Sequence, residues 1–403
     1  MHFIDLFVGC GGLSLGLSKA GWHGLFAIEK SPDAFKTFKQ NLIDKEVVTP
    51  FAWPEWLPCK PMTTSYLIKN HKDKLKKLRG SVDLIAGGPP CQGFSFAGRR
   101  NSNDPRNTLV GEYMQIVELV QPRFLLLENV RGFTTAFKQN GIDKEKVYAE
   151  VVKELLEKLD YIVFHQMCNA SMFGVPQPRP RYIMIAYKKD ICTKKSPFIE
   201  LDKLLPNYRH QKGLHKTRET SVKEAISDLE INGSKLVPSE DTKNFNQIQY
   251  KKRKLTSYQK LMRQDCKNNH IPNSLRLARH KDETLRKFNI ILMKYPKGKS
   301  LTKDELLTLG TKKQCFTPLH PDLTSRTITT LPDDLLHYSE PRILTVRENA
   351  RIQSFPDWFD FLGNYTTGGI RRKEDCPRYS QVGNAVPPLM AEALGTVIKK
   401  LLD

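Results

Sequence analysis

Short apolar runs recur along the first half of the chain, and helical patterns lie between them. Two of the runs, Val82–Ala86 and Phe124–Leu127, show no polar alternation, which is typical of strands covered on both faces. A helix over Leu13–Ala20 is stopped by Gly21, and Pro32 opens another. The remaining expected strands are Phe3–Leu6, Leu25–Ile28, Ile162–Phe164 and Tyr182–Ala186. This order predicts an α/β fold with a doubly wound, mostly parallel sheet.

Three later helices follow from apolar positions at helical spacing. The last of them, Pro388–Leu402, carries apolar residues on one face, which indicates packing against the α/β part. The other two are marked by Met114, Val117 and Val120, and by Val147, Val151, Leu155 and Leu159.

The chain is strongly basic, and its charge is concentrated in one stretch. It has 403 residues, 64 Lys and Arg against 43 Asp and Glu, and a net charge of +21. Residues 243–287 hold 13 basic and 3 acidic residues. A solvated lysine-rich surface would explain this stretch, but a phosphate-contacting face explains it better, because a polyanionic partner releases counterions when it binds. Nucleic acid is therefore the expected partner.

Other classes of protein are disfavoured. No apolar run is long enough to span a membrane. The apolar start Met1–Gly21 contains Asp5 and lacks a preceding basic residue, so a signal peptide is rejected. The eight cysteines form no CxxC pair, which favours reduced thiols in the cytoplasm and gives no zinc spacing, so no metal is expected.

The first candidate site is the glycine-rich turn Asp5–Gly12, between a strand and a helix. Glycines let such a turn close and let its backbone approach a ligand. Glu29 follows at the end of the next strand, where a carboxylate can accept ribose hydroxyls. Taken alone, this pattern also fits a hydride-transfer enzyme.

The second candidate site, Gly87–Ser95, begins where the Val82–Ala86 strand ends. This is the sheet edge at which such folds place ligands. Its Pro-Pro-Cys-Gln sequence holds the single Cys91, which would be an inert thiol in isolation. Glu128-Asn129-Val130 ends the next strand, and Gln177-Pro-Arg-Pro-Arg181 precedes a later one.

With these motifs in this order, the sequence resembles the DNA (cytosine-5) methyltransferases of bacterial restriction–modification systems. The likeness runs nearly end to end. It includes Arg106–Leu109, the Thr-Val-Arg-Glu motif within Leu344–Asp357, and Gln381–Pro388. No hydride-acceptor site accompanies these motifs, which removes the dehydrogenase interpretation.

The resemblance implies covalent catalysis on cytosine. Cys91 matches the thiol that adds to C6 of the base and makes C5 nucleophilic. Glu128 matches the acid that hydrogen-bonds N3, and Arg181 the arginine that reaches O2. Arg179 matches an arginine that contacts phosphate and supports the catalytic loop, whereas Gln177 is expected to be structural.

The resemblance also implies S-adenosylmethionine as the methyl donor, leaving S-adenosylhomocysteine as product. The implied cofactor-binding residues are Phe7, Gly9, Gly11, Gly12, Leu13, Glu29, Pro90, Leu109 and Asn384. Lys30 stands where many members have an apolar or aromatic residue. The acidic residue that usually binds the adenine amino group has no counterpart over Pro61–Lys69, where the candidates are Thr63, Thr64 and Ser65.

A base within a duplex cannot reach Cys91, so the target cytosine must be flipped out of double-stranded DNA. The resemblance implies a catalytic domain of residues 1–189 plus 341–403 and a smaller target-recognition domain of residues 190–340. It further implies a monomer that protects bacterial DNA from a cognate restriction endonuclease. The recognition sequence and the base-reading residues do not follow from the sequence.

Two alternatives share this scaffold. A tRNA cytosine methyltransferase is disfavoured by the long basic insertion and by the Gln-Gly-Phe-Ser sequence after Cys91. A DNA-binding regulator without activity is disfavoured because Cys91, Glu128 and Arg181 are all present, and because the cofactor motif begins at Asp5, which leaves no room for an N-terminal helix-turn-helix module.

Overall fold

The chain forms two compact units in a computed structural model. The first comprises Met1–Asn169, Pro180–Leu205 and Met390–Asp403, and the second Ala170–Arg179 and Pro206–Leu389. The structure describes residues 1–90, 108–134, 137–139, 142–144, 148–191, 195–231, 235–250, 254–267, 270–311, 313, 315–366 and 375–402. These two units are defined by their compactness and not by their function. The catalytic and recognition domains expected from the sequence therefore stay a prediction.

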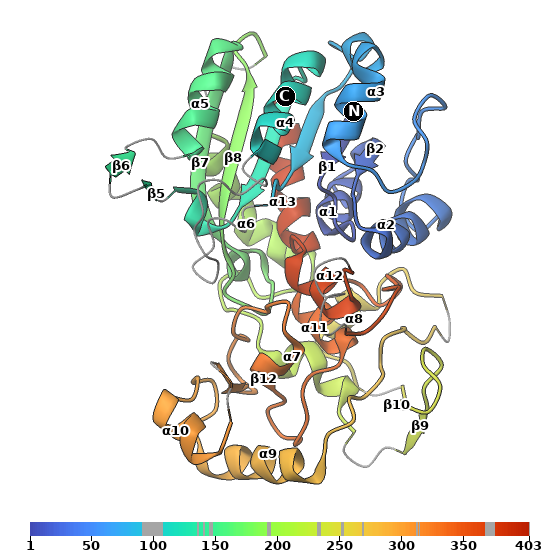
Figure 1. Cartoon of the computed structure of the whole chain (residues 1–403), viewed down its shortest axis with the longest axis vertical. Coiled ribbons are helices and arrows are strands. Elements are labelled where there is room, and N and C mark those ends of the chain that lie inside the picture. The colour runs from blue at the N-terminus through green and yellow to red at the C-terminus, as the bar shows by residue number, and fades with distance from the viewer. Residues whose placement is uncertain are drawn as a thin grey trace. The chain divides into compact units, whose positions relative to one another are not determined.

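A six-stranded sheet in the order β2-β1-β3-β4-β8-β7 organises the first unit (Figure 1). Its strands are β1 (His2–Leu6), β2 (His23–Ile28), β3 (Leu84–Gly87), β4 (Phe124–Asn129), β7 (Tyr161–Asn169) and β8 (Pro180–Lys188). The first four are parallel, which confirms the predicted class. β8 runs antiparallel to both β4 and β7, because β7 and β8 follow one another as a long hairpin.

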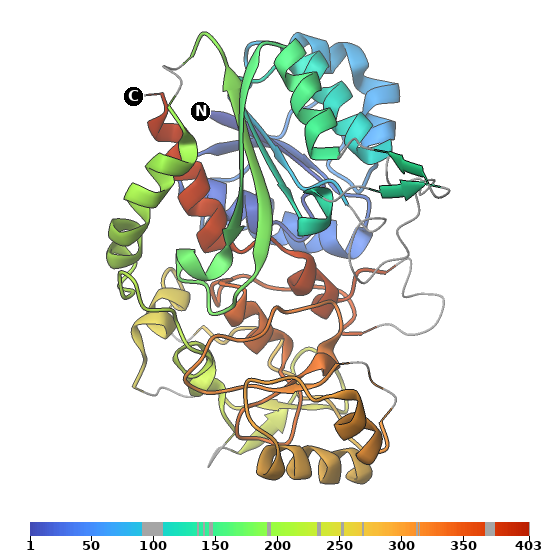
Figure 2. The ribbon, with the colours of Figure 1, turned by 90° about the vertical axis from the view of Figure 1, so that its left-hand side faces the viewer.

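Helices cover both faces of this sheet (Figure 2). Those of the first unit are α1 (Gly12–Lys19), α2 (Pro32–Lys39), α3 (Thr64–Lys77), α4 (Thr108–Val120), α5 (Tyr148–Lys158), the start of α6 (Pro197–Gln211) and most of α13 (Pro388–Lys400). α3, α4 and α5 lie on one face and form the main hydrophobic core with the strands. Its buried members include Leu67, Val117, Leu127, Val152 and Met184.

The last helix returns to the start of the chain, as the sequence predicts. The Trp22 indole donates to the Gly395 carbonyl at 3.0 Å. A Cβ on Gly395 would lie 2.9 Å from Leu17 Cδ2, so glycine allows α13 to approach α1 closely.

Short elements join these helices and strands. They are a π-helical turn η1 (Gln40–Asp44), the 3₁₀ turn η3 (Arg131–Thr134), and the strands β5 (Phe137–Gln139) and β6 (Ile142–Lys144). α2 begins where expected, because the Ser31 hydroxyl accepts the Ala34 N–H and Pro32 occupies the first turn.

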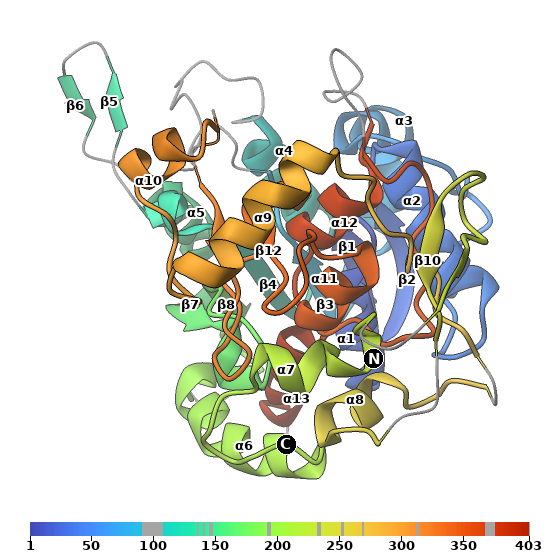
Figure 3. The same ribbon diagram turned by 90° about the horizontal axis from the view of Figure 1, so that it is seen from below.

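The second unit consists mainly of short helices and loops (Figure 3). Its helices are α7 (Val222–Ile226), α8 (Ser257–Met262), α9 (Asp282–Lys294), α10 (Lys303–Thr308), α11 (Val346–Ile352) and α12 (Arg378–Asn384), with 3₁₀ turns η4 (Ala170–Phe173), η5 (Ser227–Leu229) and η6 (Pro332–Asp334). Its described strands form two-stranded pairs, antiparallel β9 (Leu236–Pro238) with β10 (Asn246–Ile248), and parallel β11 (Thr317–Pro318) with β12 (Leu335–Leu336).

Capping boxes start four of these helices, α7, α8, α10 and α11. In α11, the Thr345 hydroxyl accepts the Glu348 N–H while the Glu348 carboxylate accepts the Thr345 N–H at 2.7 Å. Throughout the described ranges, no helix is both long and apolar enough to cross a membrane.

Buried ion pairs connect distant segments of the second unit. Arg351 binds Asp357 at 2.5 Å and Asp228 at 3.2 Å, and all three side chains are almost completely buried. Arg342 binds Glu348 through two hydrogen bonds of 2.8 Å. The Leu344–Asp357 motif therefore anchors the segment around Asp228, which belongs to residues 190–340.

Candidate active site

The glycine turn after β1 has the strained backbone that its sequence predicts. Phe7, Gly9 and Gly11 have φ of 65°, 58° and 101°. A Cβ on Gly11 would lie 2.9 Å from Leu42 Cδ1 and 3.1 Å from Phe38, so a side chain there would be strained and crowded. A Cβ on Gly9 would meet nothing within 4 Å, which leaves open space beside its backbone. Gly12 and Leu13 begin α1 directly after the turn.

Glu29 lies against this turn, which joins two residues predicted to bind the cofactor. Its carboxylate accepts the Gly9 N–H at 3.0 Å and the Ser31 N–H at 2.7 Å. Burial raises the pKa of Glu29, and these two hydrogen bonds oppose the rise. The carboxylate fixes the turn and keeps lone pairs available for hydroxyl donors.

A second acid, Asp5, lies buried beneath the turn, and the sequence pattern assigns it no role. The Ser14 hydroxyl donates to Asp5 Oδ2 at 2.5 Å, whereas the buried Oδ1 accepts no hydrogen bond among the described residues. Burial raises the pKa of Asp5 to about 7, the Ser14 hydrogen bond opposes the rise, and the charge of Glu29 adds to it.

The ends of β3 and β4 meet at the second motif. The Asn129 amide donates to the Pro89 carbonyl at 3.1 Å, which ties the Gly87–Pro90 segment to β4. A Cβ on Gly88 would lie 3.0 Å from Glu128 Oε2, so glycine lets this segment pass close to the carboxylate. Cys91 follows Pro90 and lies outside the described residues, as does the segment through Asn107.

Glu128 and Arg181 form an ion pair at this edge of the sheet. Arg181 Nε lies 2.7 Å from Glu128 Oε1, and the Arg181 and Glu128 side chains are 12% and 14% exposed, respectively. The pairing of β4 with β8 brings them together, because Glu128 ends one strand and Arg181 begins the other. The structure thus unites two residues predicted to be catalytic, although the sequence did not indicate that they pair.

Arg179 and Gln177 occupy buried positions in the second unit. Arg179 is 2% exposed and donates to the carbonyls of Ile328 and Gly383, at 2.8 and 2.5 Å. Gln177 accepts the Ile328 N–H at 3.1 Å and donates to the Ile352 carbonyl at 3.2 Å. The hydrogen bonds of Gln177 fit the structural role expected of it. Those of Arg179 show that the carbonyls of Ile328 and Gly383 hold its guanidinium in place.

The other predicted cofactor residues are spread over both units. Pro90 and Leu109 are half-buried in the first unit, at the end of the β3 loop and in the first turn of α4. Asn384 is exposed at the end of α12, in the second unit. Lys30, where many members have an apolar residue, is exposed.

An acidic group lies beside the Pro61–Lys69 segment, which has no acid of its own. The Met62 N–H donates to the Glu29 carbonyl at 2.8 Å, which places this segment beside the second strand. Glu112 of α4 accepts hydrogen bonds from the hydroxyls of Thr64 and, at 2.5 Å, Ser65. The sequence signal for Glu112 was weak, because it was simply an acidic residue three positions after Leu109.

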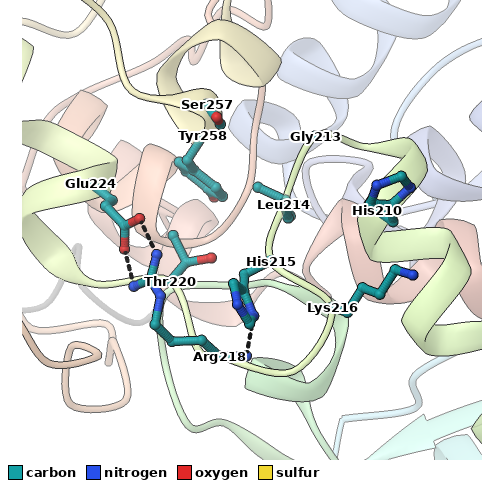
Figure 4. Close-up of a pocket in the computed structure, with 10 residues that line it drawn as sticks. All are labelled: His210, Gly213, Leu214, His215, Lys216, Arg218, Thr220, Glu224, Ser257 and Tyr258. Carbon is teal, nitrogen blue, oxygen red and sulfur yellow. Dashed lines mark hydrogen bonds and ion pairs between the residues drawn. The ribbon is translucent and has the colours of Figure 1, made fainter.

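A cavity of about 520 Å³ opens in the second unit, and none of the predicted site residues lines it (Figure 4). Its lining includes His210, His215, Lys216 and Arg218, and Arg218 forms two hydrogen bonds with Glu224. Among the described residues, no group of three or more His, Cys, Asp or Glu side chains could hold a metal ion.

Comparison with known proteins gives one consistent result. The family model for C-5 cytosine-specific DNA methylase matches residues 1–400. The type II methyltransferase M.DdeI of Desulfomicrobium norvegicum is 30% identical, over 98% of this chain and 87% of that protein. M1.HphI of Haemophilus parahaemolyticus is also 30% identical, over 100% of this chain and 87% of its own.

Solved structures agree on the fold. A prophage-encoded E. coli protein described as a DNA modification methyltransferase has a TM-score of 0.67 at 24% identity, covering 100% of this chain and 99% of its own. The Dnmt2 methyltransferase of S. pombe has a TM-score of 0.54 at 16% identity, covering 100% and 98%. The first unit therefore has the α/β methyltransferase fold.

Proposed function

Because the chain belongs to the C-5 cytosine-specific DNA methylase family and is a DNA methyltransferase of restriction–modification type, we propose that it methylates a flipped-out cytosine through a covalent Cys91 adduct. The observation that carries this proposal is the Glu128–Arg181 pair, 2.7 Å apart at the sheet edge where β3 ends, shortly before Cys91 in the sequence. An acid and a planar donor beside a thiol are what addition to cytosine requires.

The residues divide the reaction between them. The Cys91 thiolate adds to C6 of the base, and the displaced electron pair moves toward N3, where the Glu128 carboxyl supplies a proton. Arg181 orients Glu128 and donates to O2 of the base. C5 then takes a methyl group and its proton leaves to a base. Elimination of Cys91 and return of the N3 proton to Glu128 restore the neutral aromatic ring.

The glycine turn is suited to S-adenosylmethionine. Open space at Gly9 and the fixed Glu29 carboxylate offer a backbone surface and an acceptor for ribose hydroxyls. Phe7 and Leu109 supply apolar surface, and Gly11, Gly12, Leu13, Pro90 and Asn384 complete the proposed set. When bound, S-adenosylmethionine supplies the electrophilic methyl group of its sulfonium.

Glu112 completes the cofactor site in this proposal. The Thr64 and Ser65 hydroxyls orient its carboxylate at the segment that follows Glu29. An adenine amino group is a donor, so a carboxylate that already accepts two hydroxyls and has further lone pairs suits it. Glu112 thus takes the place of the acidic residue that Pro61–Lys69 lacks.

Target recognition belongs in this proposal to residues 190–340, most of which lie in the second unit. Residues 190–340 read the duplex, and residues 1–189 with 341–403 carry out catalysis. The enzyme acts as a monomer on the bacterial chromosome in the cytoplasm. It protects its site from a cognate endonuclease without forming a stable complex with it. Arg179 supports the catalytic loop by fixing the segments around Ile328 and Gly383.

The adduct is testable without knowledge of the target sequence. Duplex DNA in which 5-fluorocytosine replaces every cytosine presents fluorine where the C5 proton should leave. Fluorine cannot leave as a cation, so the enzyme should remain attached to DNA as a denaturation-resistant band that requires S-adenosylmethionine. Cys91→Ser should abolish the band, because a hydroxyl is far less ionised than a thiol. Glu128→Gln should form the adduct about 10²- to 10⁴-fold more slowly.

Two results would contradict this assignment. An adduct formed by the Cys91→Ser protein would show that another residue is the nucleophile. Methylation of tRNA but not of DNA by the wild-type enzyme would favour the tRNA methyltransferase alternative. Retention of DNA binding by Cys91→Ser is the control that this protein is folded.

A further inference from the structure

Aromatic rings and guanidinium groups stack in the second unit, within the basic stretch 243–287 and beside it. The guanidinium of Arg276 packs over two rings, 3.7 Å from the centre of Tyr365 and 4.2 Å from that of Phe245. Arg279 lies 4.6 Å from the Phe245 ring, and Arg378 lies 4.5 Å from the Tyr365 ring. At these distances the cation–π interactions are favourable.

One side of this stack is fixed by a carboxylate. Asp241 accepts hydrogen bonds from the Tyr365 hydroxyl at 2.5 Å and from Arg378 at 2.9 Å. Arg378 also donates to Ser274 Oγ at 3.0 Å and to the Gly363 carbonyl at 2.9 Å. Nε and Nη1 of Arg378 are therefore committed within the protein.

The backbone of Arg276 is fixed to the β9–β10 ribbon. Gln247 and Arg276 form an antiparallel bridge. On either side of it, the Leu277 N–H donates to the Asn246 carbonyl at 2.9 Å and the Ile248 N–H donates to the Leu275 carbonyl at 3.3 Å. The backbone of Arg276 and the rings beside its guanidinium are thus fixed before any ligand binds.

Arg276 differs from its neighbours because its side-chain donors have no acceptor among the described residues. Its buried Nε is without a hydrogen-bond partner, and the side chain as a whole is half-buried. Arg279, by comparison, donates to the Asn244 carbonyl. Because no acceptor in the described part of the chain occupies it, the half-buried guanidinium of Arg276 has donors available to a ligand.

We propose that Arg276 reads a guanine in the major groove of the target duplex by donating two hydrogen bonds to its O6 and N7. This proposal rests on the proposed DNA methyltransferase function. A planar fork beside fixed rings suits two acceptors in one plane, as O6 and N7 of guanine are, and because a phosphate can accept the same fork, the test below separates the two ligands. A two-stranded ribbon fits the major groove, and the excess of basic residues around it suits DNA.

The test is a comparison of methylation motifs in a methylation-free host. Bisulfite sequencing of genomic DNA gives the motif of the wild-type enzyme and of each variant. Arg276→Lys keeps the charge but loses the fork, so discrimination at one G·C pair should fall by about 5- to 150-fold while the rest of the motif is kept. Arg79→Lys, at an exposed position outside the basic stretch, is the control and should leave the motif unchanged.

A second variant probes the pre-orientation. Phe245→Leu removes one ring and leaves the fork, so the same G·C position should be read with weaker discrimination than in wild type. This variant also decides the question if Arg276→Lys proves unstable.

Other outcomes overturn the inference. An unchanged motif in both variants would make the stack purely structural. A uniform loss of methylation at an unchanged motif would make Arg276 a phosphate-binding residue, and Arg276→Gln, which removes the charge, should then reduce the salt slope of binding by about one. Absence of 5-methylcytosine with the wild-type enzyme would instead refute the proposed function.

Discussion

The two compact units differ in the charge that they bury. The first surrounds its sheet with one large cluster of aliphatic and aromatic residues. The second also buries apolar side chains, among them Val346, Phe355 and Phe359, but beside them it buries the charged residues Arg347, Arg351, Glu348 and Asp357, each 0% exposed. Hydrophobic burial is non-directional, whereas a buried ion pair is stabilising only with complete partners. The stability of the first unit should therefore tolerate substitutions that change the shape of a buried apolar side chain. The stability of the second unit should depend on individual charged residues.

This difference predicts opposite responses to pH. Burial raises the pKa of Asp5 to about 7. The stability that Asp5 contributes is therefore fully present below its ordinary value of 3.8 and lost as pH rises to about 7. For Asp357, burial is the largest single influence and raises the pKa, but the charge and hydrogen bonds of Arg351, the charge of Arg347 and the Tyr250 hydrogen bond together outweigh it, so the pKa is lowered overall. Its contribution is present above the ordinary value and is lost as pH falls below it.

The largest expected effect is that of Arg351→Met. Asp228 and Asp357 would each remain buried without this guanidinium, which should cost about 3–5 kcal/mol of unfolding free energy. Urea unfolding monitored by circular dichroism at pH 7 measures this change.

Arg218→Met is the matched control for this substitution. Arg218 pairs with Glu224 through a side chain that is 58% exposed, so removing it should cost no more than about 1 kcal/mol. If both variants are destabilised equally, the buried network does not hold the second unit together.

A smaller effect, with a distinct pH dependence, is expected of Asp5→Asn. The amide cannot ionise, so this variant should gain on the order of 3 kcal/mol relative to wild type between pH 5 and pH 8. Thermal unfolding at the two pH values gives this difference. Asp73→Asn, at an exposed position on α3, should show no such change, and a pH-independent Asp5→Asn difference would mean that Asp5 does not titrate in this range.

The sequence predicted what depends on local signals. The β1 strand, its glycine turn and α1 were readable because the turn residues and the apolar pattern are adjacent in the chain. The position of Glu29 at a strand end next to the turn was predictable for the same reason.

The interactions that the sequence did not indicate join distant segments. Glu112 reaches Thr64 across 48 residues, and Arg351 reaches Asp228 across 123. The Glu128–Arg181 pair depends on the antiparallel placement of β8, which the apolar pattern does not encode. Hydrophobic periodicity gives the element type, and only the folded chain shows which charges meet.

A moderate effect on cofactor affinity is expected of Glu112→Gln. Without the charged acceptor, binding of S-adenosylhomocysteine should weaken by about 1–3 kcal/mol, as it should in Glu29→Ala, which serves as a positive reference. Isothermal titration calorimetry measures both. Glu118→Gln, an exposed acid on the same helix, is the control, and unchanged affinity in folded Glu112→Gln would remove this residue from the site.

The smallest effect concerns the charge difference between the units. The triple change of Lys251, Lys252 and Lys254 to Gln lies in the basic stretch of the second unit, where the first two residues are outside the described ranges. If these lysines bind phosphates, affinity should fall equally for all DNA sequences, and the salt slope should fall by about one for each phosphate that is no longer neutralised. Fluorescence anisotropy at several salt concentrations measures this slope. The same change of Lys72, Lys74 and Lys76, exposed on α3, removes equal charge from the first unit and should leave the slope nearly unchanged. Equal slopes for both triple variants would show that the basic stretch acts only through total charge, because direct phosphate binding depends on where the lysine lies.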